Sequence, residues 1–382
     1  MCRLLRFIYK KLYFKLFGVV CLSPKKYTGK RVLLSYLTLP FLIRPGEQLS
    51  TFHSNYWECA EIAKTFLEKG YKVDIIDWDN ATFVPSVHYD ICIDVHNNLR
   101  RLKPYLVETL KIFHITNAHW LVAKEGELNR LAALKKRRGF SLQPRRVLTP
   151  SYNIEEADCA TILGNDYTKS TYAYAKKEIF RVPVSSTRTF ELPRQKDFEL
   201  ARNHFLWFSG SGAIHKGLDL VLEAFARTPE LYLTVCGPIK SENDFVDAYS
   251  KELRDTPNIV YLGRIDITGP KFLELTRTCG AVLLPSSSEG GGGSVVNCMQ
   301  AGLIPVVTKE ASVDTADFGI VILEATVDSV VASINKVATM PAEELRVRSE
   351  KAWRYARQHH SREQFAKNYR DTIETILSKY GK

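Results

Sequence analysis

The sequence predicts an α/β protein made of two consecutive Rossmann-like domains, each a parallel sheet covered by helices, with a cleft between them. Three observations lead to this prediction. The 382 residues are too many for one hydrophobic core and suit two or three domains. From Arg31 onward, apolar runs typical of buried strands alternate with helical stretches, as in parallel sheets covered on both faces. A segment rich in Pro, Ser and Thr at 182–197 interrupts the series, which then restarts.

The first series starts at RVLLSYL. We expect its strands at 31–37, 72–77, 90–95, 111–116 and 159–164, and a helix at 54–69 that ends before Gly70. Three of these strands lead into polar clusters, at 77–79, 96–98 and 117–119. Open α/β sheets bind ligands at the carboxyl ends of their strands, so these clusters are expected to line the cleft. The segment before the last strand is polar and includes the basic run LKKRRGF at 134–140.

The second series and the end of the chain complete the layout. We expect strands at 204–210, 231–237, 258–263, 280–285 and 304–308, with helices near 216–228, 242–254, 269–278 and 294–301. Pro341 suits a first helical turn, and Ser361 with Gln364 forms a capping-box pattern. The last helix has an apolar face that must bury against the domains: Phe365, Tyr369, Ile373, Ile376, Leu377 and Tyr380. The predicted units are a basic segment (1–29), a first domain (30–185), a second domain (186–355) and a helix (356–382) that packs back on the first domain.

The net charge of +11 is concentrated at the start of the sequence. Ten of the 53 Lys and Arg residues precede the first acidic residue, Glu47, which leaves 43 cations against 42 carboxylates for the remainder. The body of the protein is therefore nearly neutral, which argues against nucleic acid as a partner. Eight cysteines without a CxxC pair or zinc spacing predict free thiols in a reducing compartment.

A helix over residues 1–20 would be basic on one half and uncharged on the other. The cations are Arg3, Arg6, Lys10, Lys11 and Lys15, and the uncharged face holds Leu5, Ile8, Tyr9, Leu12, Tyr13, Leu16 and Val19. Such a helix suits the interface of an anionic membrane, but its uncharged run is too short to span one. We expect peripheral attachment to the cytoplasmic face of a membrane through residues 1–31. A helix packed on the protein's own body, or a frayed tail, is the alternative.

The string SSSEGGGGSVVNCMQAGLIPVV, at 286–307, is the most informative motif. It follows a predicted strand and opens onto a predicted helix, an arrangement that suits a diphosphate. The expected donor-binding residues are Gly290, Gly291, Gly292, Gly293, Ser294 and Asn297. Glu289, at the end of the strand, is expected to be a catalytic carboxylate that accepts hydrogen bonds from sugar hydroxyls. A mobile glycine turn with an exposed glutamate is the alternative.

A second motif, FSGSGAIHKGLDLVLEAF, again joins a strand, glycines and a helix. Gly210, Gly212 and Lys216 are expected to bind the donor. Lys216 is also expected to be catalytic, because a cation there can neutralise the diphosphate of a leaving nucleotide without a metal ion. The alternative is a surface lysine beside a loop. His215 is expected to be a neighbour rather than a participant.

These two motifs, in this order within one domain, resemble those of retaining nucleotide-sugar glycosyltransferases of the GT-B class, particularly glycosyltransferase family 4. That family carries a Gly-Arg…Lys-Gly element, a glutamate, a glycine-rich loop, a second glutamate eight positions on, and Ala-Gly-x-Pro-Val-Val. This sequence has Gly210, Lys216 and Gly217, then Glu289, and then AGLIPVV at 301–307. The resemblance covers residues 30–380 in layout, and its specific motifs lie in the second half.

Two positions depart from the family pattern. Asn297 stands where the second glutamate is expected, which in the family binds the ribose hydroxyls. Ser211 stands where an arginine is expected, so one positive charge beside the diphosphate is missing. Arg264, after NIVYLG, is a candidate replacement for that charge.

The first domain is expected to bind the acceptor. By similarity to the family, a histidine at a strand end points into the cleft, and we expect His114 in this catalytic position, with His119 and His96 as reserves. His53, Asn55 and Glu58 are weaker candidates at the start of the first helix. Asp77-Trp78-Asp79 matches the metal-binding DxD of another glycosyltransferase fold, but the two-domain layout is a complete competing account, and no metal site is expected.

The predicted function is transfer of a hexose from a UDP-, GDP- or ADP-sugar to a lipid-linked or polysaccharide acceptor, with retention of configuration and without a cofactor. Two alternatives remain open: a catalytically degenerate GT-B protein that acts as a binding partner or scaffold, and a nucleotide-sugar epimerase. A nicotinamide dehydrogenase is disfavoured, because the first strand leads into LPFLIRPG rather than GxGxxG.

Overall fold

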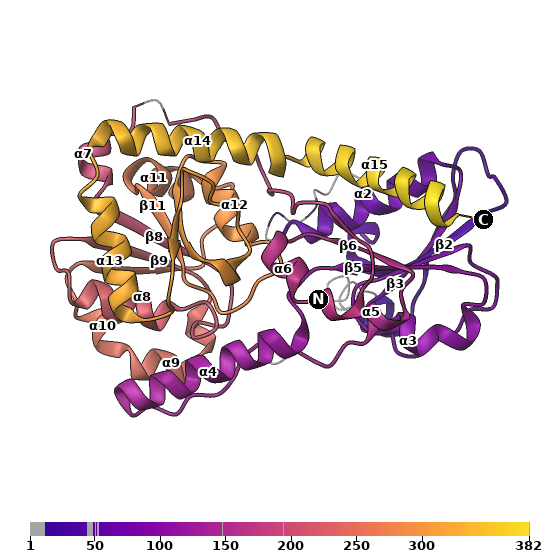
Figure 1. The fold of residues 1–382 in the computed structure, drawn as a ribbon, viewed down its shortest axis with the longest axis horizontal. Coiled ribbons are helices and arrows are strands. Elements are labelled where there is room, and N and C mark those ends of the chain that lie inside the picture. Colours follow the sequence, from indigo (N-terminus) through magenta and orange to yellow (C-terminus); the bar gives the residue numbers. More distant parts are fainter. Residues whose placement is uncertain are drawn as a thin grey trace, which may run out of the picture.

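The computed structural model describes residues 12–43, 49, 51, 53–146, 148–193 and 195–381. It consists of two lobes, each built on one sheet with helices on both faces (Figure 1). The predicted class, α/β with two Rossmann-like domains, is confirmed. Residues 1–11, which hold much of the predicted basic helix, lie outside the described residues.

The first domain contains a seven-stranded sheet with the order β1-β3-β2-β4-β5-β6-β7. Its strands are β1 (Val20–Leu22), β2 (Arg31–Tyr36), β3 (Lys72–Asp77), β4 (Ile91–Asp94), β5 (Leu110–Ile115), β6 (Cys159–Ile162) and β7 (Ile179–Arg181). The helices of this part are η1 (Leu39–Phe41), α2 (Asn55–Glu68), α3 (Asn98–Leu102), η2 (Lys103–Tyr105), α4 (Trp120–Arg138), α5 (Asn153–Glu156), α6 (Asp166–Ser170) and η3 (Ala173–Ala175). The five predicted strands are present. Sequence reasoning missed β1 and β7, of three residues each, and β1 is the strand that runs antiparallel to its neighbour, β3.

The second domain contains a six-stranded parallel sheet with the order β10-β9-β8-β11-β12-β13. Its strands are β8 (His204–Phe208), β9 (Tyr232–Cys236), β10 (Ile259–Gly263), β11 (Ala281–Leu284), β12 (Ile304–Thr308) and β13 (Ile320–Ile322). Its helices are α7 (Phe198–Ala201), α8 (Leu218–Ala226), η4 (Ile239–Ser241), α9 (Asn243–Ala248), α10 (Ser250–Arg254), α11 (Pro270–Thr278), α12 (Gly293–Met299), η5 (Lys309–Ala311) and α13 (Val327–Ala338). The four predicted helices are present, with residues 242–254 divided into α9 and α10.

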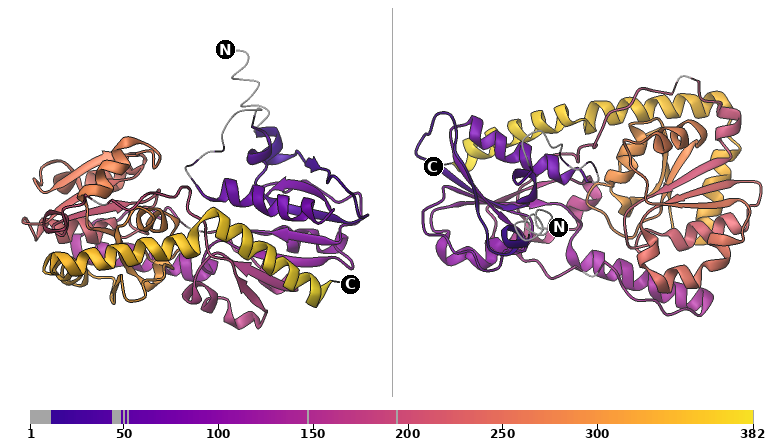
Figure 2. Two further views of the ribbon diagram at one scale, coloured as in Figure 1. Left: turned by 90° about the horizontal axis from the view of Figure 1, so that it is seen from above. Right: turned by 180° about the vertical axis from the view of Figure 1, so that it is seen from behind.

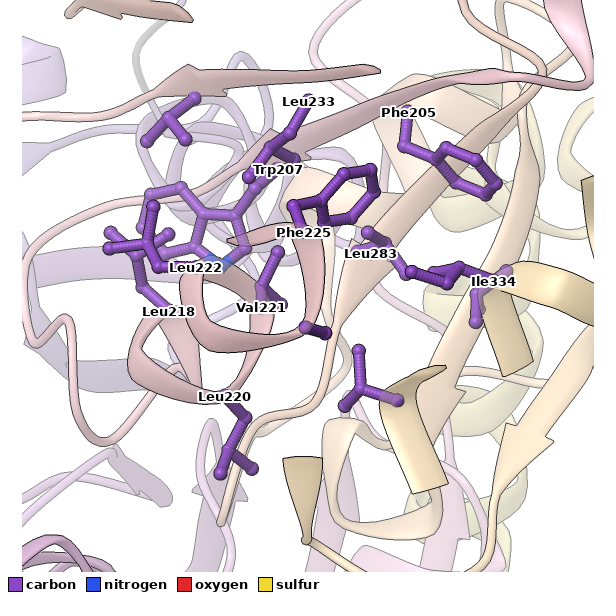
Figure 3. Close-up of a cluster of buried hydrophobic side chains, with 14 of the residues drawn as sticks. Phe205, Trp207, Leu218, Leu220, Val221, Leu222, Phe225, Leu233, Leu283 and Ile334 are labelled. Carbon is purple, nitrogen blue, oxygen red and sulfur yellow. The ribbon is translucent and has the colours of Figure 1, made fainter. Parts of the chain in front are cut away.

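Large apolar side chains fix the helices of the second domain onto its sheet. Phe205 and Trp207 of β8 are fully buried and pack with Phe225 of α8 and Ile334 of α13 (Figure 3). The rings of Phe205 and Phe225 meet edge to face, with centroids 5.4 Å apart. This packing holds the carboxyl end of β8, where the second motif begins, in a rigid frame.

Two consecutive helices at the end of the chain join the lobes. Helix α14 (Ala342–His360) packs on the second domain and α15 (Arg362–Tyr380) crosses to the first, along one edge of the molecule (Figure 1). The chain turns at Ser361, whose hydroxyl accepts a hydrogen bond from the Gln364 N–H at 3.1 Å, as the capping box predicts. The predicted apolar face of α15 is buried against the first domain through Phe365, Tyr369, Ile373 and Ile376.

Helix α4 forms a second connection at the opposite edge (Figure 2). It arises from the polar segment for which sequence reasoning expected no element, and its Leu134 belongs to the core of the second domain. Arg137 pairs with Asp219 and Glu223 of α8, each at 2.8 Å, and Arg138 pairs with Glu252. A helix that lies within the predicted range of the first domain is therefore fastened to the second.

Candidate active site

The two motif loops lie together because β8 and β11 are hydrogen-bonded neighbours in a parallel sheet. Lys216 ends the loop after β8, and Glu289 lies in the loop after β11. The Lys216 ammonium pairs with Glu289 Oε1, which also accepts a hydrogen bond from the Ser286 hydroxyl at 2.7 Å. The structure thus brings the two predicted catalytic residues of the second domain into direct contact.

The ion pair is almost enclosed, since each side chain is only 10% exposed. Burial alone would raise the pKa of Glu289, but the Lys216 ammonium, with His215 and Arg146, holds it at about 2. Burial lowers the pKa of Lys216, against the attraction of Glu289. Glu289 is therefore an ionised carboxylate at neutral pH, suited to accept hydrogen bonds or to face developing positive charge rather than to donate a proton.

His215 is fixed beside this pair. Its Nε2 lies 2.6 Å from the Ser288 carbonyl and its Nδ1 lies 3.2 Å from the Ser287 hydroxyl. Burial lowers the pKa of His215 to about 4, so the ring is neutral near pH 7. The hydrogen bonds tie the two motif loops to each other, which is a positioning role.

The glycine-rich loop packs tightly against other parts of the protein. A Cβ on Gly290 would lie 1.8 Å from the Thr116 carbonyl oxygen, at the end of β5 in the first domain. Gly292 has φ +56°, and a Cβ there would lie 2.2 Å from the Val313 side chain. At these two positions, the absence of a side chain lets the loop close against the first domain and against residue 313.

The remaining residues of this motif have different surroundings. Gly291 has φ +148° and faces Val184, whereas Gly293 and Ser294 begin α12 and are half-buried. Asn297 is buried, and its Oδ1 accepts hydrogen bonds from the Thr187 N–H (2.8 Å) and hydroxyl (3.0 Å). Its amide nitrogen donates to the Gly293 carbonyl at 2.9 Å. An amide suits this place better than a carboxylate, which has no proton to donate to that carbonyl.

A carboxylate from another part of the second domain binds the backbone of the loop after β8. Glu242, which sequence reasoning missed, accepts hydrogen bonds from the backbone N–H groups of Gly212 (2.6 Å) and Ala213 (3.0 Å). A Cβ on Gly210 would meet no atom within 4 Å, so this glycine is not required by packing. Glu242 stands at the start of a helix, and nothing in the sequence connects it to a loop thirty residues earlier.

The histidines of the first domain differ in where they lie relative to the Lys216–Glu289 ion pair. His114 is fully buried in the core of the first domain: its Nδ1 lies 2.7 Å from the Thr161 hydroxyl, and its ring lies between Tyr36 and Tyr369. Burial lowers the pKa of His114 to about 4. The structure therefore places His114 under α15 and among core side chains.

The two reserve histidines also have structural contacts. His119 is the N-cap of α4, where its Nδ1 accepts from the Leu121 N–H at 3.4 Å, and its Nε2 lies 3.2 Å from the Tyr174 hydroxyl. The ring of His96 packs on Trp78, with centroids 5.0 Å apart. Of the DxD carboxylates, Asp77 accepts hydrogen bonds from Thr38, and Asp79 pairs with Lys15 at 2.8 Å.

The pKa of His53, in the first domain, is shifted by the charges of the Lys216–Glu289 ion pair. The protein around it, and then the charges of Lys216 and Arg146, lower the pKa of His53, while Glu289 raises it. Its Nδ1 accepts a hydrogen bond from the Asn55 N–H at 3.2 Å, which leaves the proton of the neutral ring on Nε2. His53 as a residue is partly open to solvent, but its ring is close enough to the second domain to feel the charges of that domain. Glu58, in contrast, is fully buried and holds the interdomain segment through Ser185.

The two Rossmann-like domains and the paired motif loops define the class of fold, which is the GT-B fold of glycosyltransferases. Residues 191–355, which make up most of the second domain, match the family model described as glycosyl transferases group 1. No curated protein sequence matches the chain significantly.

Solved structures share the fold at low sequence identity. Sucrose-phosphate synthase from Thermosynechococcus elongatus has a TM-score of 0.60 and 11% identity, over 92% of this chain and 99% of that one. HepE from Anabaena, solved with UDP-glucose, has a TM-score of 0.56 and 14% identity, over 91% and 99%. TarM from S. aureus, solved with UDP and α-GlcNAc-glycerol, has a TM-score of 0.53 and 12% identity over 76% of this chain. The match covers 55% of TarM, so the chain spans about half the length of that protein.

Proposed function

We propose that the protein transfers a hexose from a nucleotide diphosphate sugar to a glycan or lipid-linked acceptor, with retention of configuration. The observation that carries the proposal is the buried Lys216–Glu289 pair, where β8 and β11 end. HepE, which has the same fold, was solved with UDP-glucose, and this supports a nucleotide-sugar donor. The proposed acceptor class rests on the basic and apolar segment at the start of the sequence.

In this proposal, Lys216 binds the diphosphate and stabilises the charge that develops as it leaves. Because Glu242 occupies the N–H groups of Gly212 and Ala213, the diphosphate meets side-chain cations rather than these amides. The Glu289 carboxylate accepts hydrogen bonds from the sugar hydroxyls. The acceptor hydroxyl then attacks on the face that the diphosphate leaves, and a phosphate oxygen takes its proton. Protein cations supply the positive charge that this reaction needs.

A donor screen tests the proposal. The purified full chain is incubated with UDP-, GDP- and ADP-hexoses, with and without a lipid extract of membranes, and free nucleoside diphosphate is measured. We expect release from one donor class that depends on the extract. Conversion of the donor sugar without the extract would instead indicate an epimerase.

A catalytically degenerate binding protein is the second candidate, and two observations favour it. Ser211 lacks the charge of the family's arginine, and the side chain of Asn297 is already occupied by Thr187. Calorimetric binding of a nucleoside diphosphate, combined with no release from any donor in the screen, would support this candidate and contradict the transferase.

The described part of the first segment also supports peripheral membrane attachment. Residues 12–16 are helical, and Leu12, Tyr13, Leu16 and Phe17 are 36–54% exposed. Hydrogen bonds from Thr82 to the Leu16 carbonyl (3.3 Å) and from Asn80 to the Gly18 carbonyl (3.5 Å) hold this helix against the loop after β3. No helix among the described residues has both the length and the apolar character to cross a membrane. We therefore propose attachment to the cytoplasmic face through this apolar patch and the cations in the sequence of residues 1–31.

Replacing Leu12 and Phe17 together with glutamate is expected to weaken binding to vesicles of phosphatidylglycerol and phosphatidylcholine by more than about tenfold. Complete burial of side chains of this size contributes about 1.5–3 kcal/mol each, and the added carboxylates are repelled by the anionic lipid. Cosedimentation measures the effect. Leu323→Glu is the matched control, because Leu323 is 88% exposed in the second domain. Equal cosedimentation of the double variant and the wild type would contradict the proposed attachment.

A further inference from the structure

Ser211 stands where the motif of glycosyltransferase family 4 has an arginine. The proposed diphosphate site therefore has one cation fewer from this loop. The loop from Ser209 to Gly217 contains one lysine and no arginine, so Lys216 is the cation that this loop itself supplies. Arg264 lies at the end of β10, the edge strand of the sheet, with β9 between it and β8. The inference that follows rests on the proposed function and concerns the source of the missing charge.

Arg146 lies against the loop from which the motif arginine would extend. It comes from the segment between α4 and α5, far from Ser211 in the sequence. A Cβ on Gly212 would lie 2.8 Å from Arg146 Cγ and 3.3 Å from its Cδ, so the aliphatic part of the arginine covers this glycine. The guanidinium therefore projects from a point beside Ser211.

The charge of Arg146 acts on the ion pair and on His53. Burial lowers the pKa of Lys216, and the Arg146 guanidinium contributes to the same shift. The Arg146 charge also contributes to the lowered pKa values of Glu289 and His53. Its Nε is buried and has no hydrogen-bond partner among the described residues. A buried donor of this kind is costly unless a ligand completes it.

The neighbouring arginines form hydrogen bonds or ion pairs with other residues of the protein. Arg130 donates to the Pro285 carbonyl at 2.7 Å, Arg137 pairs with α8, and Arg145 pairs with Asp244 at 2.5 Å. The contacts of Arg130 and Arg137 hold α4 on the second domain, whereas the Arg145–Asp244 pair is partly exposed to solvent. The buried carboxylate of Glu127 accepts hydrogen bonds from the N–H groups of Arg145 and Arg146, each at 2.8 Å, and so fixes the backbone at Arg146.

We infer that Arg146 is a diphosphate-binding residue that replaces, from a different part of the chain, the arginine missing at Ser211. A guanidinium can bind two phosphate oxygens at once, whereas the Lys216 ammonium acts as a point charge. Because α4 is fastened to the second domain, this cation stays with the donor motifs rather than with the acceptor domain. Donor binding therefore depends on a residue that lies outside the sequence range matched by the family model.

The test compares nucleoside diphosphates with nucleosides. Binding of UDP, GDP and ADP, and of uridine, guanosine and adenosine, is measured by calorimetry for the wild type, Arg146→Ala, Arg146→Lys and Arg145→Ala. For the nucleotide that the wild type binds, Arg146→Ala is expected to weaken diphosphate binding about 10- to 100-fold, as charge-assisted hydrogen bonds are lost, and to leave nucleoside binding unchanged. The diphosphate affinity of Arg146→Lys is expected to lie between those of the wild type and Arg146→Ala. Arg145→Ala is the matched control and is expected to bind like the wild type.

A second variant tests whether the loss of affinity in Arg146→Ala comes from the missing charge or from a change in structure. Adding Ser211→Arg to Arg146→Ala is expected to restore most of the diphosphate affinity, because the charge returns to the same place. Wild-type affinity in Arg146→Ala, or an equal loss for nucleoside and diphosphate, would overturn the inference while leaving the transferase proposal standing. If the wild type binds no nucleoside diphosphate, both the inference about Arg146 and the transferase proposal are contradicted. If binding depends on Arg146 but no donor is turned over, the inference stands and the transferase proposal fails.

Discussion

Replacing Lys216 with alanine is expected to lower kcat by about 10²–10³-fold, the usual effect of removing one fixed charge-stabilising group from an active site. Lys216 is the cation at the end of β8, and burial strengthens its interaction with a leaving diphosphate. Nucleotide release from the donor identified in the screen measures the effect. Lys240, an exposed lysine of η4, is the matched control, and Lys240→Ala is expected to retain wild-type kcat.

This substitution also leaves the carboxylate of Glu289 buried without its cation. Removing one partner of a buried ion pair typically costs about 3–5 kcal/mol of stability, so the free energy of unfolding of Lys216→Ala is expected to fall. The double variant Lys216→Ala/Glu289→Gln removes the unpaired charge and keeps an acceptor for the Ser286 hydroxyl. We expect it to regain stability in urea unfolding but not activity. Recovery of activity in the double variant would show that Lys216 has only a structural role.

Replacing Gly290 with alanine is expected to open the contact between the domains. Its Cβ would lie 1.8 Å from the Thr116 oxygen and 2.4 Å from the Thr116 carbonyl carbon. Thr116 directly follows the buried strand β5, and backbone atoms there cannot move aside like a flexible side chain. The radius of gyration from small-angle X-ray scattering should rise. The activity should fall about 10²-fold, the effect that a displacement of about 1 Å can have on reacting groups.

Gly210→Ala provides the comparison for this experiment. It is the same chemical change in the neighbouring motif loop, but a Cβ at Gly210 meets nothing within 4 Å. The radius of gyration of Gly210→Ala should therefore equal that of the wild type. If Gly290→Ala scatters and unfolds like the wild type, then the glycine-rich loop does not hold the domains together in solution.

The order of the main elements and the two motif loops could be predicted from the amino-acid sequence. Strands such as β2, β8 and β11 are short runs of buried apolar residues, and their type can be read from neighbours in the chain. The cap at Ser361 and the apolar face of α15 are equally local patterns. Because parallel strands bring their carboxyl ends to one edge, the motifs also predict that Lys216 and Glu289 lie on the same edge of the sheet. Their direct contact depends on the pairing of β8 with β11, which the strand order of the fold decides.

The charges from distant parts of the chain that surround this ion pair could not be predicted, because the fold brings them there. The buried face of α4 consists of Ala123, Glu127, Arg130 and Leu134, so half of it is charged and it lacks the apolar periodicity that predicts a packed helix. Its attachment depends on ion pairs with residues about 80 or more positions away, such as Asp219. The places of Arg146, Glu242 and Asn297 depend likewise on partners far along the chain. Local hydrophobic patterns record which residues face a core, whereas contacts between polar groups from separate elements exist only once the chain has folded.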